Sequence, residues 1–522
     1  MRALLALLAA AACLLAVSPG ASAAAPCTPH WVGSWAASPN DGSLLQPFAD
    51  QTLRMIVAPH LAGSTLRVHL SNRFGLLPVT LGPVTIGLQS SGASLVPGTE
   101  RAVTFNGQAT VTIPPGEDVV SDPVDLTFAA FQDLAVSVDV SGVVIDPTEH
   151  FITRQTSYLS PVLSGDHSAD ISGSAFTQTT TGVYSTGWYF LDGIDVLAPG
   201  SQGAVVAFGD SITDGYQGIL GSTEQLATIN TNGRYPDDLA RRLIAAKIPL
   251  SVLNAGIGGN MLLTTGGPSG PSGLARFATD ALDQAGVTDV IVLEGINDIS
   301  AGATASQIIG GYEQLIAQAH GAGVHIQLGT ITPAEGSTFA SGDAASEVIR
   351  EQVNQWIRTQ TLSDGVIDFD AAVRDPSDPS EVNPAYDGGD HIHFNLAGYQ
   401  AMANAISVSM LERPQCTIVA PVARVWASAA ASRRPAHPGL MVHWSGTDTN
   451  DPGAAPAFTV QVQRTAHHRS GVSHWQTLAG LAATTKTSVW IALHPSEKLR
   501  FRVRVTGGSG VDGRWATTSS LS

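Results

Sequence analysis

Apolar and polar residues alternate strictly along much of the first 200 residues. In "STLRVHLSN", Leu66, Val68 and Leu70 fall on one face, and "DLAVSVDVSG" repeats the pattern. A period of two is typical of half-buried strands. Short strands separated by turns rich in Gly, Pro, Asn and Ser predict an N-terminal β-sandwich domain over residues 24–200.

From about residue 201 the pattern changes to short apolar strands that alternate with helical periodicity. The predicted strands cover residues 204–208, 250–253, 290–293, 324–328 and 366–369. Segments such as "RYPDDLARRLIAAK" place apolar residues at helical spacing between them. This alternation predicts an α/β domain over 201–416, built on an open, doubly wound parallel sheet. Ligands bind such sheets beyond the carboxyl ends of the strands.

After Cys416 the chain again shows strand periodicity, in "AFTVQVQR" and "KLRFRVRV". About 105 residues of this kind predict a fibronectin type III-like β-sandwich over 417–522. Lys498, Arg500, Arg502 and Arg504 share one face of a predicted strand. We interpret this as a solvated face in preference to a strip that binds polyanions.

The N-terminus has the pattern of a secretory signal peptide. Arg2 is followed by the apolar run 3–17 and by Ala21-Ser22-Ala23, so residues 1–23 are predicted to be removed on export and the protein to be extracellular. No later apolar stretch is long enough to predict a transmembrane segment. Export makes a disulfide between Cys27 and Cys416 plausible, with two free thiols as the alternative.

Length and charge narrow the function classes. A chain of 522 residues is too long for one ordinary core. The net charge is −17, but residues 417–522 carry 11 Lys and Arg against 4 Asp and Glu, whereas the rest carries 15 against 39. An acidic body argues against nucleic acid as the main partner.

Candidate chemistry begins at "VVAFGDSITDG", where the first parallel strand runs into Gly209, Asp210 and Ser211. A serine at that sheet edge could be a nucleophile, and it then needs a base held by an orienting group. In the later loop "GGDHIHFNLAGY", the spacing of Asp390 and His393 allows a carboxylate to hold the imidazole. His391 is the rival base, although it follows the acid directly. His320 instead fits the capped end of a helix, and His325, within a strand, is predicted to lie in the core.

An oxyanion intermediate needs hydrogen-bond donors, and two segments after strands offer them. "NAGIGGN" contains Gly256, Gly258 and Gly259, whose backbone NH groups can approach a ligand closely. "EGINDIS" presents Asn297, whose amide can donate. Gly and Asn are also ordinary turn residues, so each segment alone leaves both interpretations open.

Taken together, "FGDSITDG", "NAGIGGN", "GIND" and "DHIHFN" resemble the SGNH (GDSL-type) serine hydrolase family over residues 201–410. The N-terminal stretches "WVGSWAASP" and "LSNRFG" look like a secreted actinobacterial subgroup of that family. The resemblance implies a flavodoxin-like sheet, Ser211 as nucleophile, and Asp390 with His393 as the rest of the triad. It implies oxyanion donors at Ser211, Gly259 and Asn297. It implies hydrolysis of carboxylic esters without a cofactor or metal.

The substrate is a small-molecule or polymer-borne ester, and the family resemblance leaves several classes open. They include carbohydrate O-acetyl esters and lysophospholipid or lipase-type esters. The Gly- and Ser-rich insert 264–273 is predicted to border the site and to favour an open polar cleft. The β domains could contact cell wall or polysaccharide, with Trp31 and Trp35 as candidates for sugar stacking against the alternative of core packing.

Two rival classes of function were weighed against the esterase. One is a metal-dependent hydrolase that uses Asp387, Asp390, His391 and His393 as ligands. The other is a non-catalytic surface binding protein with an inactive enzyme core. The sequence offers no second His/Asp cluster at suitable strand ends, which argues against the metal hydrolase, and every catalytic residue type is present, which argues against the binding protein.

Overall fold

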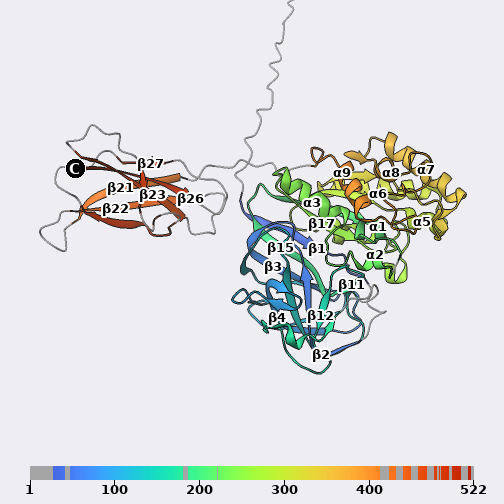
Figure 1. Ribbon diagram of the computed structural model, residues 1–522, viewed down its shortest axis with the longest axis horizontal. Helices are drawn as coiled ribbons and strands as arrows, with labels where there is room; N and C mark the ends of the chain where they lie inside the picture. Colours follow the sequence, from blue (N-terminus) through green and yellow to red (C-terminus); the bar gives the residue numbers. More distant parts are fainter. Residues whose placement is uncertain are drawn as a thin grey trace, which may run out of the picture.

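The structure is a computed structural model that describes residues 28–40, 47–179, 186–219, 221–411, 422–430, 439–447, 457–466, 475–478, 481, 484–492, 497–506 and 515–518 (Figure 1). The predicted signal peptide and the predicted Cys27–Cys416 disulfide lie outside the described residues.

The N-terminal region consists of antiparallel strands. One sheet has the order β1-β15-β3-β8, with β9 also paired to β3. Its strands are β1 (His30–Ala36), β15 (Leu191–Ala198), β3 (Gly63–Ser71), β8 (Asp118–Val120) and β9 (Val124–Phe128). The alternating Leu66, Val68 and Leu70 are fully buried in β3, as their period of two predicts.

The second N-terminal sheet has the order β13-β12-β2-β10-β4-β5, and β6 and β7 also pair with β4. Its strands are β13 (Gln178–Thr179), β12 (Ser157–Leu159), β2 (Phe48–Val57), β10 (Leu134–Val144), β4 (Val79–Ser91), β5 (Ser94–Leu95), β6 (Arg101–Val103) and β7 (Val111–Ile113). A small ribbon pairs β11 (Glu149–Phe151) with β14 (Gly187–Tyr189), and η1 (Gly173–Ala175) is a 3-10 turn.

The central region contains the predicted parallel sheet, in the order β17-β16-β18-β19-β20. Its strands are β16 (Gly203–Gly209), β17 (Leu250–Gly256), β18 (Val287–Leu293), β19 (His325–Gly329) and β20 (Gly365–Ile367). The prediction of an α/β fold with an open parallel sheet is confirmed, since each predicted apolar run overlaps one of these strands.

Helices alternate with those strands, as the 3.6-residue periodicity predicts. They are α1 (Ser211–Asp214), α2 (Thr223–Leu226), α3 (Tyr235–Ala245), α4 (Gly273–Phe277), α5 (Ile296–Ser300), α6 (Ala305–Ala322), α7 (Ala344–Thr359), α8 (Phe369–Val373) and α9 (Leu396–Ala405). Short 3-10 turns lie at η2 (Gly267–Ser269) and η4 (Ala340–Gly342), and a π turn, η3 (Ala278–Leu282), continues α4.

The N-terminal strands and the α/β region share one hydrophobic core. Gly33 of β1 donates its NH to the carbonyl of Ala285 at 2.8 Å. A Cβ on Gly33 would lie 2.6 Å from a methyl group of Leu253, so β1 packs directly on β17. Figure 1 shows the N-terminal strands adjoining the α/β region. The two predicted domains are therefore packed as one unit across the predicted boundary at residue 200.

Burial decides between the two interpretations of Trp35. Trp35 is 7% exposed and packs edge-on against Trp188, with ring centroids 4.8 Å apart. The alternative of core packing therefore holds for Trp35, because its apolar ring fills the core. Trp31 is half-buried, and the Arg67 guanidinium lies 4.6 Å from its ring centroid.

The C-terminal region has a separate hydrophobic cluster. Its described strands form the sheets β21-β22-β25 and β24-β23-β26-β27, all antiparallel. They are β21 (Val422–Ala430), β22 (Gly439–Thr447), β23 (Ala457–Ala466), β24 (Gln476–Thr477), β25 (Ser488–Ala492), β26 (Glu497–Thr506) and β27 (Ala516–Thr517). On the basic face of β26, Arg502 lies 4.4 Å from the ring centroids of both Trp475 and Trp515.

Candidate active site

The serine predicted as nucleophile lies at the carboxyl end of the central strand β16. Asp210 caps α1 by accepting the NH of Ile212 at 2.9 Å, and Ser211 is the first residue of that helix. Gly209 must be glycine here, because a Cβ would lie 2.1 Å from Thr213 Oγ1 and 2.4 Å from the carbonyl oxygen of Leu293. The tight turn holds Ser211 at the sheet edge with 8% exposure.

His393 faces this serine. Its Nε2 lies 2.8 Å from Ser211 Oγ, and its Nδ1 lies 2.7 Å from Asp390 Oδ2. Asp390 Oδ1 also accepts the backbone NH of His393 at 2.9 Å. Burial alone would raise the pKa of Asp390, but hydrogen bonding and the charge of His393 outweigh it and hold that pKa below its usual range. Asp390 is thus held as a carboxylate that orients the imidazole.

The rival histidine points elsewhere. His391 has a left-handed backbone, with φ of 63°, and its side chain is 56% exposed. Its Nδ1 pairs with Asp387 Oδ2 at 2.9 Å. The four residues of the proposed metal cluster are therefore arranged as two separate acid–histidine pairs. Across the described residues, three or more potential ligands do not converge on a metal site anywhere.

The two remaining candidate histidines, His320 and His325, lie away from Ser211. His320, in the last turn of α6, has its Nε2 2.9 Å from Asp364 Oδ2. His325 lies in β19, but its side chain is 44% exposed and 3.9 Å from the same carboxylate, so its interpretation as core is wrong.

The glycine-rich loop after β17 lies beside the serine turn. Ile257 donates its NH to the Gly209 carbonyl at 3.0 Å, and Asn254 Nδ2 donates to the carbonyl of Thr213 at 2.9 Å. Gly259 has φ of +72°, which glycine adopts without strain. A Cβ on Gly259 would lie 2.6 Å from Ser269 Oγ, so the insert 264–273 does border this loop.

Asn297 lies in α5, directly after β18. Its Nδ2 donates to the Asn260 carbonyl at 2.9 Å, which uses one of the two amide hydrogens. The neighbouring Asp298 accepts the NH groups of Leu262 and Leu263 at 2.7 and 2.9 Å. Asn297 in α5 and Gly259 in the glycine-rich loop, two of the predicted oxyanion donors, thus lie in adjoining segments.

Sequence reasoning missed Arg276, which is 3% exposed and joins all three loops. Its guanidinium donates to the Gly209 carbonyl at 2.9 Å, to the Ala255 carbonyl at 2.8 Å and to Asn260 Oδ1 at 2.8 Å. It also pairs with Glu294 and Asp280, each at 3.2 Å. The only signal in the sequence is an arginine inside the otherwise apolar and small "GLARFA".

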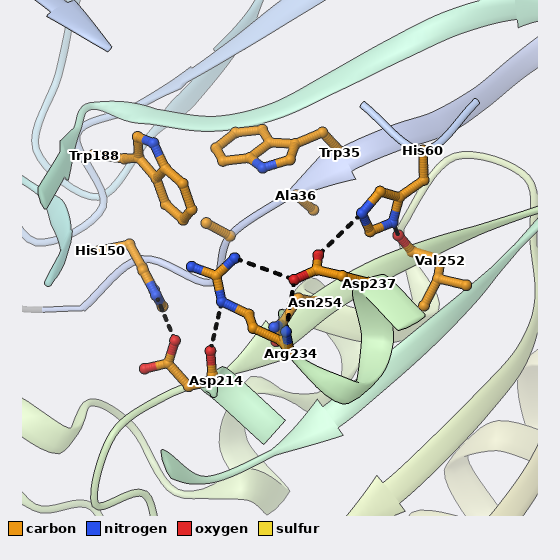
Figure 2. A pocket seen from close by; sticks show the side chains of 11 residues that line it. Trp35, Ala36, His60, His150, Trp188, Asp214, Arg234, Asp237, Val252 and Asn254 are labelled. Carbon is orange, nitrogen blue, oxygen red and sulfur yellow. Dashed lines mark hydrogen bonds and ion pairs between the residues drawn. The ribbon is translucent and has the colours of Figure 1, made fainter. Parts of the chain in front are cut away.

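The N-terminal region contacts α1, the helix that begins with Ser211 (Figure 2). His150 Nε2 lies 3.2 Å from Asp214 Oδ1, at the end of α1, and Arg234 Nε donates to the Asp214 carbonyl at 2.8 Å. His60 contacts Asp237 at 3.1 Å. Burial would raise the pKa of Asp237, but the hydrogen bond from His60 and the charges of Arg234 and His60 lower it to about 2. Figure 2 shows Trp35 and Trp188 beside these groups, around a small pocket.

Aromatic rings line the histidine side of the site. The Tyr216 ring is 5.5 Å from the His393 ring, and the half-exposed Phe339 ring is 6.1 Å from it. A Cβ on Gly258 would lie 2.5 Å from the Tyr216 hydroxyl. Tyr216 therefore spans from the imidazole to the glycine-rich loop.

The chain is similar to one known family and to several solved structures. Residues 207–401 match the model of the GDSL-like lipase/acylhydrolase family. Among solved structures, the aryl esterase of M. smegmatis is 18% identical, with 39% of this chain and 95% of that chain covered and a TM-score of 0.31. A carbohydrate acetylesterase from Sinorhizobium meliloti is 17% identical, with 39% and 96% covered and a TM-score of 0.31.

No curated protein matches the chain. At such identities and TM-scores, the family assignment rests on the sequence match over residues 207–401. Residues 207–401 thus form a GDSL-like lipase/acylhydrolase domain, and this match supports an ester hydrolase.

Proposed function

We propose that this protein is a secreted serine esterase in which Ser211, His393 and Asp390 form the catalytic triad. The observation that carries the proposal is the continuous hydrogen-bonded line from Ser211 Oγ through His393 to Asp390, at 2.8 and 2.7 Å. A nucleophile, a base within hydrogen-bond reach and an acid that orients the base are the parts that acyl transfer needs.

In the proposed mechanism, His393 Nε2 takes the proton of Ser211 as Oγ attacks the ester carbonyl. The NH groups of Ser211 and Gly259 and the free amide hydrogen of Asn297 then stabilise the oxyanion. The protonated His393 gives its proton to the departing alcohol. Water, deprotonated by His393, releases the acid from Ser211 and restores the enzyme.

Short acyl groups, such as acetyl groups on carbohydrate, are the proposed substrate class. Supporting this, the insert 264–273 places the small polar Ser269 against Gly259, beside the proposed oxyanion donors. Lysophospholipase or lipase-type use is the alternative class, and the exposed Phe339 beside His393 is the observation that favours it.

Export and the β domains remain proposals. The signal-like residues 1–23 support an extracellular location. No helix among the described residues is both long and apolar enough to cross a membrane. The antiparallel sheets and separate core of β21–β27 support the fibronectin type III-like assignment. Contact of these β regions with polysaccharide stays a prediction.

The test is a series of p-nitrophenyl acyl esters from two to sixteen carbons, assayed with excess chelator and with Ser211→Ala as the blank. We expect turnover to be highest at two to four carbons and to vanish in the variant. A maximum at eight carbons or more would replace the proposed class by the lipase-like one. Equal turnover by the variant would remove Ser211 as nucleophile.

Asn297→Ala is expected to lower kcat by about 10²–10³, as loss of one oxyanion donor does, with little change in KM. The amide would act only when charge develops on the carbonyl oxygen, so the loss belongs to the transition state. Steady-state kinetics of the folded variant measure both constants. A raised KM at unchanged kcat would assign Asn297 to substrate binding instead.

A further inference from the structure

Arg154 is a buried cation that lacks a counter-ion. It belongs to the segment after β11 and is 6% exposed, with a left-handed φ of 57°. The NH of Asn230 donates to its carbonyl oxygen at 2.9 Å, which holds this conformation. Within the described residues, Arg154 takes part in no ion pair, and its Nε and Nη2 have no hydrogen-bond acceptor. Only Nη1 donates, to Thr228 Oγ1 at 3.2 Å.

A second unpartnered donor shares the same cavity. Gln225 of α2 is 2% exposed, and its Nε2 has no acceptor among the described residues. Its Oε1 is already used, accepting the NH of Gly221 at 2.6 Å. Arg154 and Gln225 line a small cavity between the N-terminal and α/β regions, together with Ile152, Thr186 and Ile229.

The carboxylates near this cavity already pair with other residues. Asp214 pairs with His150, and Asp237 is shared by His60 and Arg234. Burial lowers the pKa of the Arg154 guanidinium, and the charge of Arg234 adds to that effect while Asp214 opposes it. An unpaired buried charge with unmade hydrogen bonds is costly, so an anion that accepted from these donors would stabilise the fold.

We propose that Arg154 and Gln225 form a binding site for a small anion, of the size of a halide ion or a single carboxylate group. Arg154 supplies the charge and the Nε and Nη2 donors, and Gln225 supplies its Nε2 donor. The site is distinct from the triad. It lies beside Tyr216, whose ring centroid is 5.7 Å from the Arg154 Cζ and 5.5 Å from the His393 ring centroid.

The test measures thermal unfolding of the full chain in sodium gluconate against chloride, formate or acetate at equal ionic strength. The carboxylate of gluconate is attached to a branched, hydroxyl-bearing carbon that is too bulky for the cavity, whereas acetate and a succinyl chain are unbranched. We expect a saturable rise in Tm of about 2–4 °C with the small anions. Arg154→Met is expected to abolish the response.

If Arg154→Met does not fold, Gln225→Glu provides a second variant for the same Tm measurement. Glutamate retains the Oε acceptor for Gly221 and places a carboxylate oxygen where Nε2 stands, so it supplies an internal anion. We expect this variant to have a raised Tm in gluconate and no response to chloride. A response in both variants equal to that of the wild type would overturn the proposal.

The carboxylate could also be delivered by the substrate, and a second arm separates the sources. KM is compared for p-nitrophenyl acetate and a p-nitrophenyl monoester of succinic acid. The site belongs to the substrate if free anions do not change Tm and the KM for the charged ester is tenfold lower than that for the acetate. This difference in KM should then be lost in Gln225→Glu. If neither effect is observed, the cavity holds water alone and the proposal fails. Inactivity toward both esters counts against the esterase proposal and leaves the Tm result standing.

Discussion

Replacing His393 by alanine is expected to lower kcat by about 10⁵-fold or more, while replacing His391 leaves it within about twofold. His393 Nε2 is the base that lies 2.8 Å from Ser211 Oγ, so its loss leaves the serine without a proton acceptor. His391 is two residues away, but its side chain is exposed and paired with Asp387. Steady-state kinetics on a short-chain p-nitrophenyl ester measure the difference.

His391→Ala is the matched control in this comparison, because both changes remove an imidazole from the same loop. Circular dichroism and Tm of the two variants check that each remains folded. Comparable losses of kcat would mean that the loop rearranges on binding substrate. Loss in His391→Ala alone would reverse the assignment of the base.

Arg276→Lys is expected to lower kcat by about 10²-fold in a folded protein. Lysine keeps the charge but has a single nitrogen, which cannot reach the carbonyls of Gly209 and Ala255 and the amide of Asn260 together. These contacts fix the turn at Ser211 relative to the glycine-rich loop after β17. A misplacement of about 1 Å can lower kcat by about 10²-fold. Arg276→Met would further leave Glu294 without its ion-pair partner, at about 3–5 kcal/mol, whereas Asp280 would keep its pair with Arg73.

Arg54→Lys is the matched control, since Arg54 is also fully buried and donates to the carbonyls of Ala93, Ser168 and Asp170 in the N-terminal region. Both variants should lower Tm, but only Arg276→Lys should lower kcat with little change in KM. If the two variants lose stability alike and keep kcat, Arg276 has a purely structural role.

The N-terminal strands and the α/β region pack against each other, and the prediction of two domains says nothing about this contact. Period-two alternation identifies half-buried strands, but it does not say what covers them. In the folded protein Gly33 packs against Leu253, and His150 reaches Asp214 at the end of the helix that begins with Ser211. Trp35, considered for sugar binding, lies inside this contact.

The sequence by itself determined the α/β class, the strand that ends at Ser211 and the residues proposed for the triad and the oxyanion donors. Those features depend on local periodicity, on glycine where a Cβ has no room, and on the three-residue spacing of Asp390 and His393. Only the tertiary structure showed that His393, and not His391, lies within hydrogen-bond distance of Ser211, because the left-handed backbone at His391 turns the two side chains apart. It alone revealed Arg276 and Arg154, since a buried charge is defined by what surrounds it, and Gly209 and Thr228, which they contact, lie 67 and 74 residues away along the chain.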